Sequence, residues 1–321
     1  MSKKIKWGVL STAGIGRKRV IPAIQQSNNG IVHAVASRNL DSARLFADKL
    51  DIPVAYGSYE ELLTDPDIDA IYNPLPNSMH AEWSIKAAEA GKPMLCEKPL
   101  ASNTDEAQKM VDAFAGRDIL FAEAFMYRFH PQTVRVKQLL DEGTIGTLQG
   151  IMAAFTFPVQ DESNIRLNVD LAGGSLMDVG CYCVNVIRLM TGAEPVSVQA
   201  FANMHNGVDE SLTGILKFES GVLAHFDSSL RSSYNHMYQL RGTKGRILVE
   251  EAFVPQPDTT TTIRIWDETG VHTAISIAPA NHYTLMAEDF ADALLNNRPP
   301  RYAPQDAVEQ MRVLDSLYAA L

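Results

Sequence analysis

Short apolar runs alternate with amphipathic segments through the first part of the chain, and this alternation constrains the fold more than any other feature. Ile5–Leu10 and Ile31–Ala36 are typical of strands, and Ile15–Gln26 between them is typical of a helix. Helices of this length between strands indicate a parallel sheet with right-handed crossovers. We therefore expect a doubly wound α/β domain, in which Asp41 is the N-cap of a helix at Ser42–Leu50.

The pattern changes after about Glu123. Strand-like runs dominate from Leu148 to Ile277, one helix-like segment interrupts them at Ser175–Met190, and two more close the chain. This pattern predicts an α+β domain with a large, mostly antiparallel open sheet. We expect one domain over residues 1–123 and a second over residues 124–321, whose C-terminal helix can pack back on the first. A second copy covering the open sheet face would give a homodimer or homotetramer.

Composition excludes several classes of function. The 321 residues suit about two domains, and a net charge of −10 from dispersed acids argues against nucleic-acid partners. Apolar runs fall short of the ~18 residues of a membrane span, and the N-terminus lacks a secretory apolar segment. Three cysteines cannot form a disulfide framework, which favours a cytoplasmic protein. The histidines and cysteines lack metal-ligand spacing, so we predict no metal site.

The turn after the first strand has the position of a phosphate-binding turn. Its residues are Ser11, Thr12, Ala13, Gly14, Ile15 and Gly16. Small residues let the backbone approach a pyrophosphate, although the glycine pattern is degraded and a generic turn is the alternative. Arg17, Lys18 and Arg19 follow, where cations oppose the helix dipole unless a phosphate is bound; a solvated basic face is the alternative and is preferred for Lys18.

The end of the second strand indicates which dinucleotide would bind. NAD sites place an acid about 20 residues beyond the glycines, on the ribose 2′-hydroxyl. Here Ser37 and Arg38 occupy that region, and both can donate to a 2′-phosphate. The sequence therefore favours NADP, with NAD as the alternative.

A lysine stands at the carboxyl end of a short buried strand. Glu97-Lys98-Pro99 follows the apolar run Pro93–Cys96, at the edge where open α/β sheets bind ligands. Proline fixes φ next to the ammonium group, and we expect the Lys98–Pro99 bond to be cis. Without a cofactor site nearby, this stretch would be an ordinary loop.

A second candidate cluster opens the helix of the second half. Gly173–Tyr182 begins with a glycine turn, and Asp178 and Tyr182 are four residues apart, so they share a helix face. A tyrosine is a poor base at its free pKa of about 10, but a nearby ammonium such as that of Lys98 would lower this pKa. Asp178 could orient the lysine or bind substrate. The alternatives are a core role for Tyr182 and a helix-dipole role for Asp178.

Together with Gly8–Arg17, Tyr72–His80 and Glu123–Pro131, these segments resemble a known family over essentially the full length. It is the glucose-fructose oxidoreductase / inositol dehydrogenase / rhizopine-catabolism (Gfo/Idh/MocA) oxidoreductase family, and the chain is most similar to its dimeric dihydrodiol dehydrogenase and NADP-dependent D-xylose dehydrogenase branch. The resemblance implies a Rossmann domain, a lysine (Lys98) that hydrogen-bonds the reacting oxygen, and Tyr182 as acid/base where many members have histidine. Asp178 matches the acid of the same motif.

The resemblance also implies further contacts. The cofactor side of the site would include Asn73, Leu75, Pro76, Asn77, His80, Glu97 and Lys98, with a cap or core role as the alternative for His80. The substrate side would include Tyr127, Arg128 and Phe129. From its position in the loop before the second-half helix, we also expect Arg166 to border this pocket. An ion pair at the domain junction is the alternative for Arg128, and a surface loop for Arg166.

These features lead to an expected activity. We expect an NADP-dependent oxidoreductase that transfers a hydride between nicotinamide and a sugar or cyclic polyol. The preferred hypothesis is an aldose 1-dehydrogenase that acts on a D-xylose-like sugar. Dehydrogenation of a trans-dihydrodiol and reduction of a sugar ketone are the alternatives within enzymes. A non-catalytic NAD(P)-binding sensor is the alternative of another class, but it would be expected to lose Lys98 or its partners, which are present here.

Overall fold

The computed structural model describes residues 3–321, which form two compact units. The first contains the described residues up to Met126 together with His282–Val308. The second contains Tyr127–Asn281 and Glu309–Leu321. Among residues 3–321, no helix is both long and apolar enough to cross a membrane.

The first unit is built on six parallel strands in the order β3-β2-β1-β4-β5-β6. Their bounds are β1 (Ile5–Leu10), β2 (Gly30–Ala36), β3 (Val54–Tyr56), β4 (Ala70–Asn73), β5 (Met94–Glu97) and β6 (Phe121–Ala124). The strand order reverses between β1 and β4, and such a switch point is where open α/β sheets bind ligands. The predicted doubly wound Rossmann sheet is confirmed.

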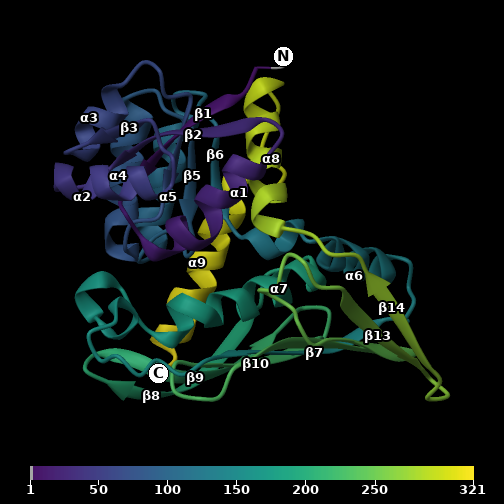
Figure 1. Ribbon diagram of the computed structural model, residues 1–321. Coiled ribbons are helices and arrows are strands. Elements are labelled where there is room, and N and C mark those ends of the chain that lie inside the picture. Colours follow the sequence, from purple (N-terminus) through teal and green to yellow (C-terminus); the bar gives the residue numbers. More distant parts are fainter. Residues whose placement is uncertain (1–2) are drawn as a thin grey trace. The chain divides into compact units, whose positions relative to one another are not determined.

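Helices cover both faces of this sheet (Figure 1). Their bounds are α1 (Ile21–Gln26), α2 (Leu40–Lys49), α3 (Tyr59–Thr64), α4 (Asn77–Glu89), α5 (Thr104–Ala115) and α8 (His282–Leu295). The assignment of α8 to the first unit differs from the expected domain division, in which all residues after 123 belong to the second domain. This helix belongs to the first unit because Trp7 packs on Phe290, with ring centroids 5.2 Å apart, and Glu288 accepts hydrogen bonds from Asn28.

The N-cap of α2 is Asn39, so the prediction of Asp41 was wrong. The Asn39 Oδ1 atom accepts the backbone N–H of Ser42 at 2.9 Å. Asparagine and aspartate cap equally well, and the helix begins at Leu40, which leaves Asp41 inside the first turn. There it lies 3.8 Å from the guanidinium of Arg44.

The second unit contains an eight-stranded sheet in the order β14-β13-β12-β11-β7-β10-β9-β8. Its strands are β7 (Leu148–Thr156), β8 (Ser197–His205), β9 (Val208–Lys217), β10 (Leu223–Ser229), β11 (Asn235–Gly242), β12 (Gly245–Val249), β13 (Thr261–Asp267) and β14 (His272–Ile277). β7 and β10 pair parallel and the other neighbouring strands pair antiparallel, as predicted.

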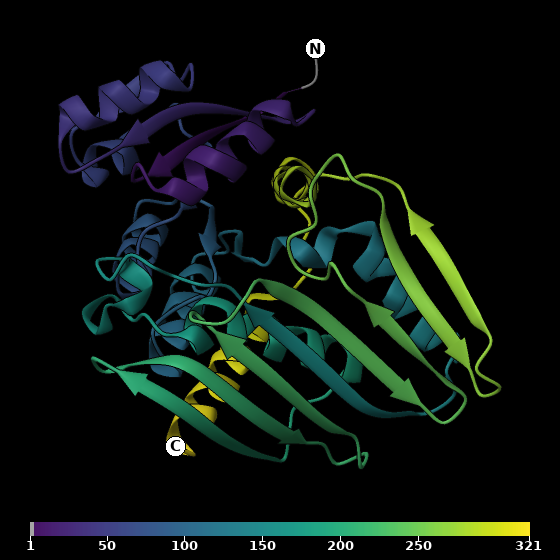
Figure 2. The same ribbon diagram turned by 60° about the horizontal axis from the view of Figure 1, so that its bottom comes forward.

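The helices of the second unit gather on one face of its sheet. They are α6 (Pro131–Asp141), the π-helical turn η5 (Leu176–Gly180), α7 (Cys181–Thr191) and the C-terminal part of α9 (Pro304–Ala319). Figure 1 shows α7 and this part of α9 above the sheet, and Figure 2 shows them behind it. The opposite face, which is toward the viewer in Figure 2, is covered by none of the described helices of the second unit.

Candidate functional site

The turn after β1 leaves backbone accessible at the switch point. Ser11 has φ +79°, and its Oγ atom accepts the N–H of Ala13 at 3.2 Å, which closes the turn. A Cβ added to Gly14 would meet no atom within 4 Å. The following turn, η1 (Gly16–Val20), is π-helical, a geometry frequent at functional sites. This turn therefore leaves open space beside its backbone at Gly14.

Positive charge lies beside this turn. Arg17, Lys18 and Arg19 are exposed in η1, which has no acid in its first turn. Arg38 is also exposed, directly after β2, and the two strand ends are joined by a 2.9 Å hydrogen bond from the Ser11 N–H to the carbonyl of Ala36. The phosphate-type turn and the predicted 2′-phosphate residues thus come together at one sheet edge.

The loops after β4 and β5 are tied together by a buried histidine. Nε2 of His80 lies 2.8 Å from the carbonyl of Leu75, and Nδ1 lies 3.0 Å from the carbonyl of Pro99. The side chain is fully buried, and burial lowers its pKa. These contacts favour the core role for His80 over direct contact with a cofactor. Asn73, also buried, accepts the N–H of Leu75 at 3.2 Å and shapes the same loop.

Glu97 is held by a buried tyrosine from the neighbouring strand. The Tyr72 hydroxyl donates to Oε1 of Glu97 at 2.6 Å, and Oε2 accepts the backbone N–H of Lys98 at 3.3 Å. Burial, assisted by the Glu97 charge, raises the pKa of Tyr72 well above its usual range. Lys98 is half-buried, and the Lys98–Pro99 bond is cis, as predicted.

In the second unit, Asp178 lies on η5 and Tyr182 lies on α7, which directly follows η5 in the chain. Tyr182 is 5% exposed, and its ring is surrounded by aromatic rings. Centroid distances are 5.4 Å to Phe155, 5.5 Å to Phe253 and 5.9 Å to Tyr127. Ring packing of this kind fixes the phenol in one orientation.

Arg166 joins this group. Its Nε atom donates to Oδ2 of Asp178 at 2.6 Å, and its guanidinium lies 5.6 Å from the ring centroid of Phe157. The Asp178 carboxylate raises the pKa of Arg166, and the Tyr182 phenol adds to this effect. The structure thus brings three predicted residues together, Arg166, Asp178 and Tyr182. A planar cation, a carboxylate and a phenol beside aromatic rings are groups that can bind and orient neighbouring hydroxyls.

The other predicted substrate residues are mostly inside the unit. Tyr127 is fully buried, and its hydroxyl donates to Oδ1 of Asn185 in α7 at 2.7 Å. This contact holds α7 in place. Arg128 is buried and Phe129 is half-buried. Sequence reasoning missed Phe155 and Phe253, which lie in a strand and an irregular segment with no pattern that distinguishes them from core residues.

One group of potential metal ligands forms that no spacing in the sequence revealed. Glu162, His205 and Glu210 offer ligand atoms within 4.8 Å of one another. However, Arg231 pairs with both carboxylates, at 2.9 Å to Glu162 and through its Nη2 atom to Glu210. One guanidinium therefore offsets one of the two negative charges, and the cluster forms an ion-pair network at the surface.

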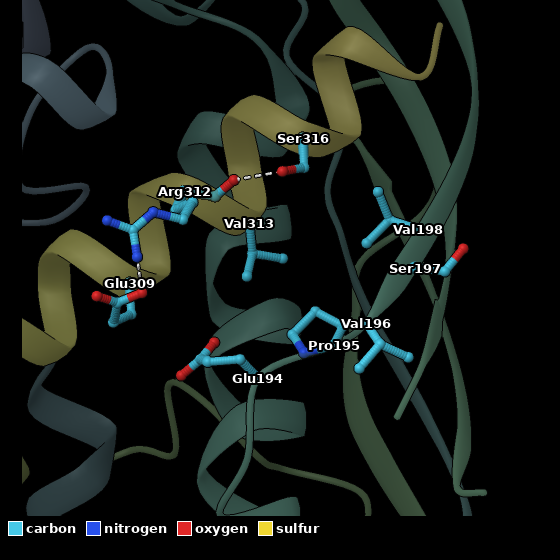
Figure 3. A pocket seen from close by; sticks show the side chains of 9 residues that line it. All are labelled: Glu194, Pro195, Val196, Ser197, Val198, Glu309, Arg312, Val313 and Ser316. Carbon is cyan, nitrogen blue, oxygen red and sulfur yellow. Dashed lines mark hydrogen bonds and ion pairs between the residues drawn. The ribbon is translucent and has the colours of Figure 1, made fainter. Parts of the chain in front are cut away.

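A separate hollow lies between α9 and the segment that leads into β8 (Figure 3). Its volume is about 160 Å³, and Val313 and Ser316 of α9 lie across from Pro195 and Val196. None of the predicted site residues lines it. The hollow is therefore distinct from the groups described above.

Two family descriptions match the chain. "Oxidoreductase family, NAD-binding Rossmann fold" matches residues 5–125. "GFO/IDH/MocA C-terminal domain" matches residues 133–248.

Individual relatives match nearly the full length. D-xylose 1-dehydrogenase (NADP(+)) 2 from Haloferax volcanii is 39% identical over 314 residues, which cover 97% of this chain and 96% of the relative. Trans-1,2-dihydrobenzene-1,2-diol dehydrogenase from Xenopus laevis is 36% identical over 251 residues, covering 76% and 74%. A crystal structure of a 3-ketoreductase from Actinomadura kijaniata with NADP and TDP-benzene matches with a TM-score of 0.94 at 30% identity, covering 99% and 98%.

Proposed function

This chain belongs to the GFO/IDH/MocA family of NADP-dependent sugar oxidoreductases, and we propose that it oxidises an aldose of the D-xylose type at its anomeric carbon. The observation that carries the proposal is the 39% identity to an NADP-dependent D-xylose 1-dehydrogenase across 97% of the chain. The presence of Lys98, Asp178 and Tyr182 supports it, because these residues supply the proton-transfer groups that carbinol oxidation needs.

The residues of the first unit fit a bound NADP. Ser11 to Gly16 would receive the pyrophosphate at the switch point, and Ser37 and Arg38 would bind the 2′-phosphate, where an NAD site would carry an acid. Leu75, Pro76 and Asn77 would border the nicotinamide end. When bound, NADP⁺ accepts the hydride that leaves the sugar carbon.

The proton is handled by side chains of the protein. In the proposed step, Tyr182 takes the proton of the reacting hydroxyl, and the Lys98 ammonium donates a hydrogen bond to the reacting oxygen of the substrate. Asp178 and Arg166 bind a neighbouring hydroxyl, and their 2.6 Å contact keeps both in place. The aromatic rings around Tyr182 exclude water from the phenol.

A comparison within the family supports the two leading residues. Solved forms of the Actinomadura ketoreductase include a Lys→Ala and a Tyr→Phe variant, both with TDP-benzene and NADP. The substituted lysine and tyrosine of that protein are the same number of residues apart as Lys98 and Tyr182. The similarity to the Actinomadura ketoreductase, with a TM-score of 0.94, supports reduction of a sugar ketone as the second candidate activity.

We also propose a cellular location and an oligomeric state. Three buried, unbridged cysteines support a reducing cytoplasmic location. The open face of the second-unit sheet carries exposed apolar side chains on adjacent strands, at Phe201, Ile215 and Leu223. A second copy can bury them, because the two-fold symmetry of a homodimer makes one patch complementary to itself.

A substrate screen tests the proposed activity. The purified chain is mixed with NADP⁺ and, separately, with D-xylose, other pentoses, hexoses and a trans-dihydrodiol, and NADPH absorbance is followed. We expect the highest kcat/KM with an aldopentose and lower activity with NAD⁺ in parallel reactions. Turnover of the dihydrodiol alone, or of none of these compounds, would overturn the aldose assignment.

A further inference from the structure

A buried carboxylate outside the catalytic motif lies against the first turn of the helix that carries Asp178 and Tyr182. Asp209, in β9, is 0% exposed. Burial raises its pKa, while hydrogen bonds from Ser175 and Tyr318 act in the opposite direction. Burying a carboxylate is costly unless donors satisfy it, so its partners show what it is there to hold.

Three donors meet this carboxylate. Oδ2 accepts the Ser175 hydroxyl and the Leu176 N–H, both at 2.7 Å, and Oδ1 accepts the Tyr318 hydroxyl at 2.7 Å. Leu176 is the first residue of η5, and Ser175 makes no capping bond of its own. One orphan backbone N–H at the start of this helical segment, that of Leu176, is therefore satisfied by Asp209 of β9.

The glycine turn before η5 is shaped around the same carboxylate. Gly174 has φ +114°, and a Cβ there would overlap the Oδ1 atom of Asp209. Its N–H donates to the carbonyl of Arg166 at 2.8 Å. A Cβ on Gly173 would overlap that same carbonyl. The turn is thus fixed on one side by Asp209 and on the other by the backbone of the residue that pairs with Asp178.

We propose that Asp209 is a positioning residue for the oxidoreductase reaction, which fixes the start of the Asp178–Tyr182 helix and is itself held by Tyr318 of α9. The proposal rests on the proposed function for its kinetic consequences. Loss of the anchor would let η5 shift, and a displacement on the order of 1 Å at a reacting group can cost about a hundredfold in rate. Cofactor binding, which uses residues of the first unit, would be unaffected.

The experiment compares Asp209→Asn and Tyr318→Phe with wild type in the full chain. Tyr238→Phe is the matched control, because Tyr238 is fully buried and its hydroxyl has no partner among residues 3–321. Amide hydrogen exchange with NADP⁺ present reports on residues 173–183, and kinetics with D-xylose and its C1-deuterated form report on hydride transfer.

We expect faster exchange over residues 173–183 in both Asp209→Asn and Tyr318→Phe, but not in Tyr238→Phe. In Asp209→Asn, kcat should fall tenfold to about a hundredfold, with KM for NADP⁺ within about twofold and a larger deuterium isotope effect on kcat. Unchanged exchange in Asp209→Asn would overturn the proposal. So would a fall in kcat with an unchanged isotope effect, which indicates a smaller active fraction. Absence of wild-type turnover would overturn the proposed function instead, and the exchange data decide on the anchor without substrate.

Discussion

At the scale of single residues, Arg38 is the side chain that we propose favours NADP over NAD. Its guanidinium is exposed after β2, and no acid precedes it in the region that would bind a ribose 2′-hydroxyl. Nearby Tyr59 shows that the group also acts locally: burial raises the pKa of Tyr59, and Arg38 opposes that effect. The Arg38 guanidinium thus lies beside the end of β2 and does not point away from it.

Replacing Arg38 by glutamine should weaken NADPH binding tenfold to about a hundredfold, because a charge-assisted hydrogen bond is worth about 1.5–3 kcal/mol. NADH binding should change much less, since NADH lacks the 2′-phosphate. Fluorescence titration of both reduced dinucleotides measures the two constants. Arg44→Gln is the control, because Arg44 is exposed on the adjoining helix α2. Equal losses for NADPH and NADH would contradict the assignment.

At the scale of elements, His236 couples β11 to the segment after β12. Its Nδ1 atom accepts the backbone N–H of Phe253 at 3.1 Å, and Phe253 is one of the rings around Tyr182. Only a neutral imidazole can accept this bond. Burial lowers the pKa of His236 to about 4.

This lowered pKa predicts a pH dependence of stability. The unfolded chain takes up the proton near pH 6.5 and the folded chain only near pH 4, so the stabilising contribution is complete above pH 6.5 and is lost as the pH falls toward 4. Between pH 7 and pH 5 the loss is about 2 kcal/mol. Urea unfolding of wild type and His236→Gln should show a difference that shrinks over this range. A difference independent of pH would disprove the coupling.

Prediction from sequence succeeded where local patterns specify structure. Strand β1 (Ile5–Leu10) and the parallel, doubly wound sheet of the first unit follow from apolar periodicity and the alternation of strands with helices. The site was predicted only where residues lie near a recognisable turn, as with Asp178. Asp209 and Phe253 reach the same region through tertiary packing of distant segments, and nothing in their local sequence marks them. The same cause explains α8, whose membership in the first unit depends on contacts with Trp7 and Asn28.

At the scale of the whole molecule, the open sheet face should be an interface between two copies. Ile215 is 45% exposed near the C-terminal end of β9, paired with Gln199 on one side and His225 on the other. A charged side chain there would be buried against its own symmetry mate, which is unfavourable.

We therefore expect Ile215→Lys to convert a wild-type dimer or tetramer into smaller species, as measured by light scattering after gel filtration. Leu45→Lys is the matched control, because Leu45 is 58% exposed on α2 of the first unit and is not part of this sheet. A monomeric wild type, or an Ile215→Lys variant that assembles like wild type, would contradict the proposed interface.

A tyrosine in the second unit, Tyr182, is proposed to move the proton during sugar oxidation. The most direct test is the kcat of Tyr182→Phe with the best substrate of the screen, together with NADPH affinity. We predict that kcat falls about a hundredfold or more while the Kd for NADPH stays within about twofold, as for a lost acid/base group. Turnover equal to wild type would contradict the account.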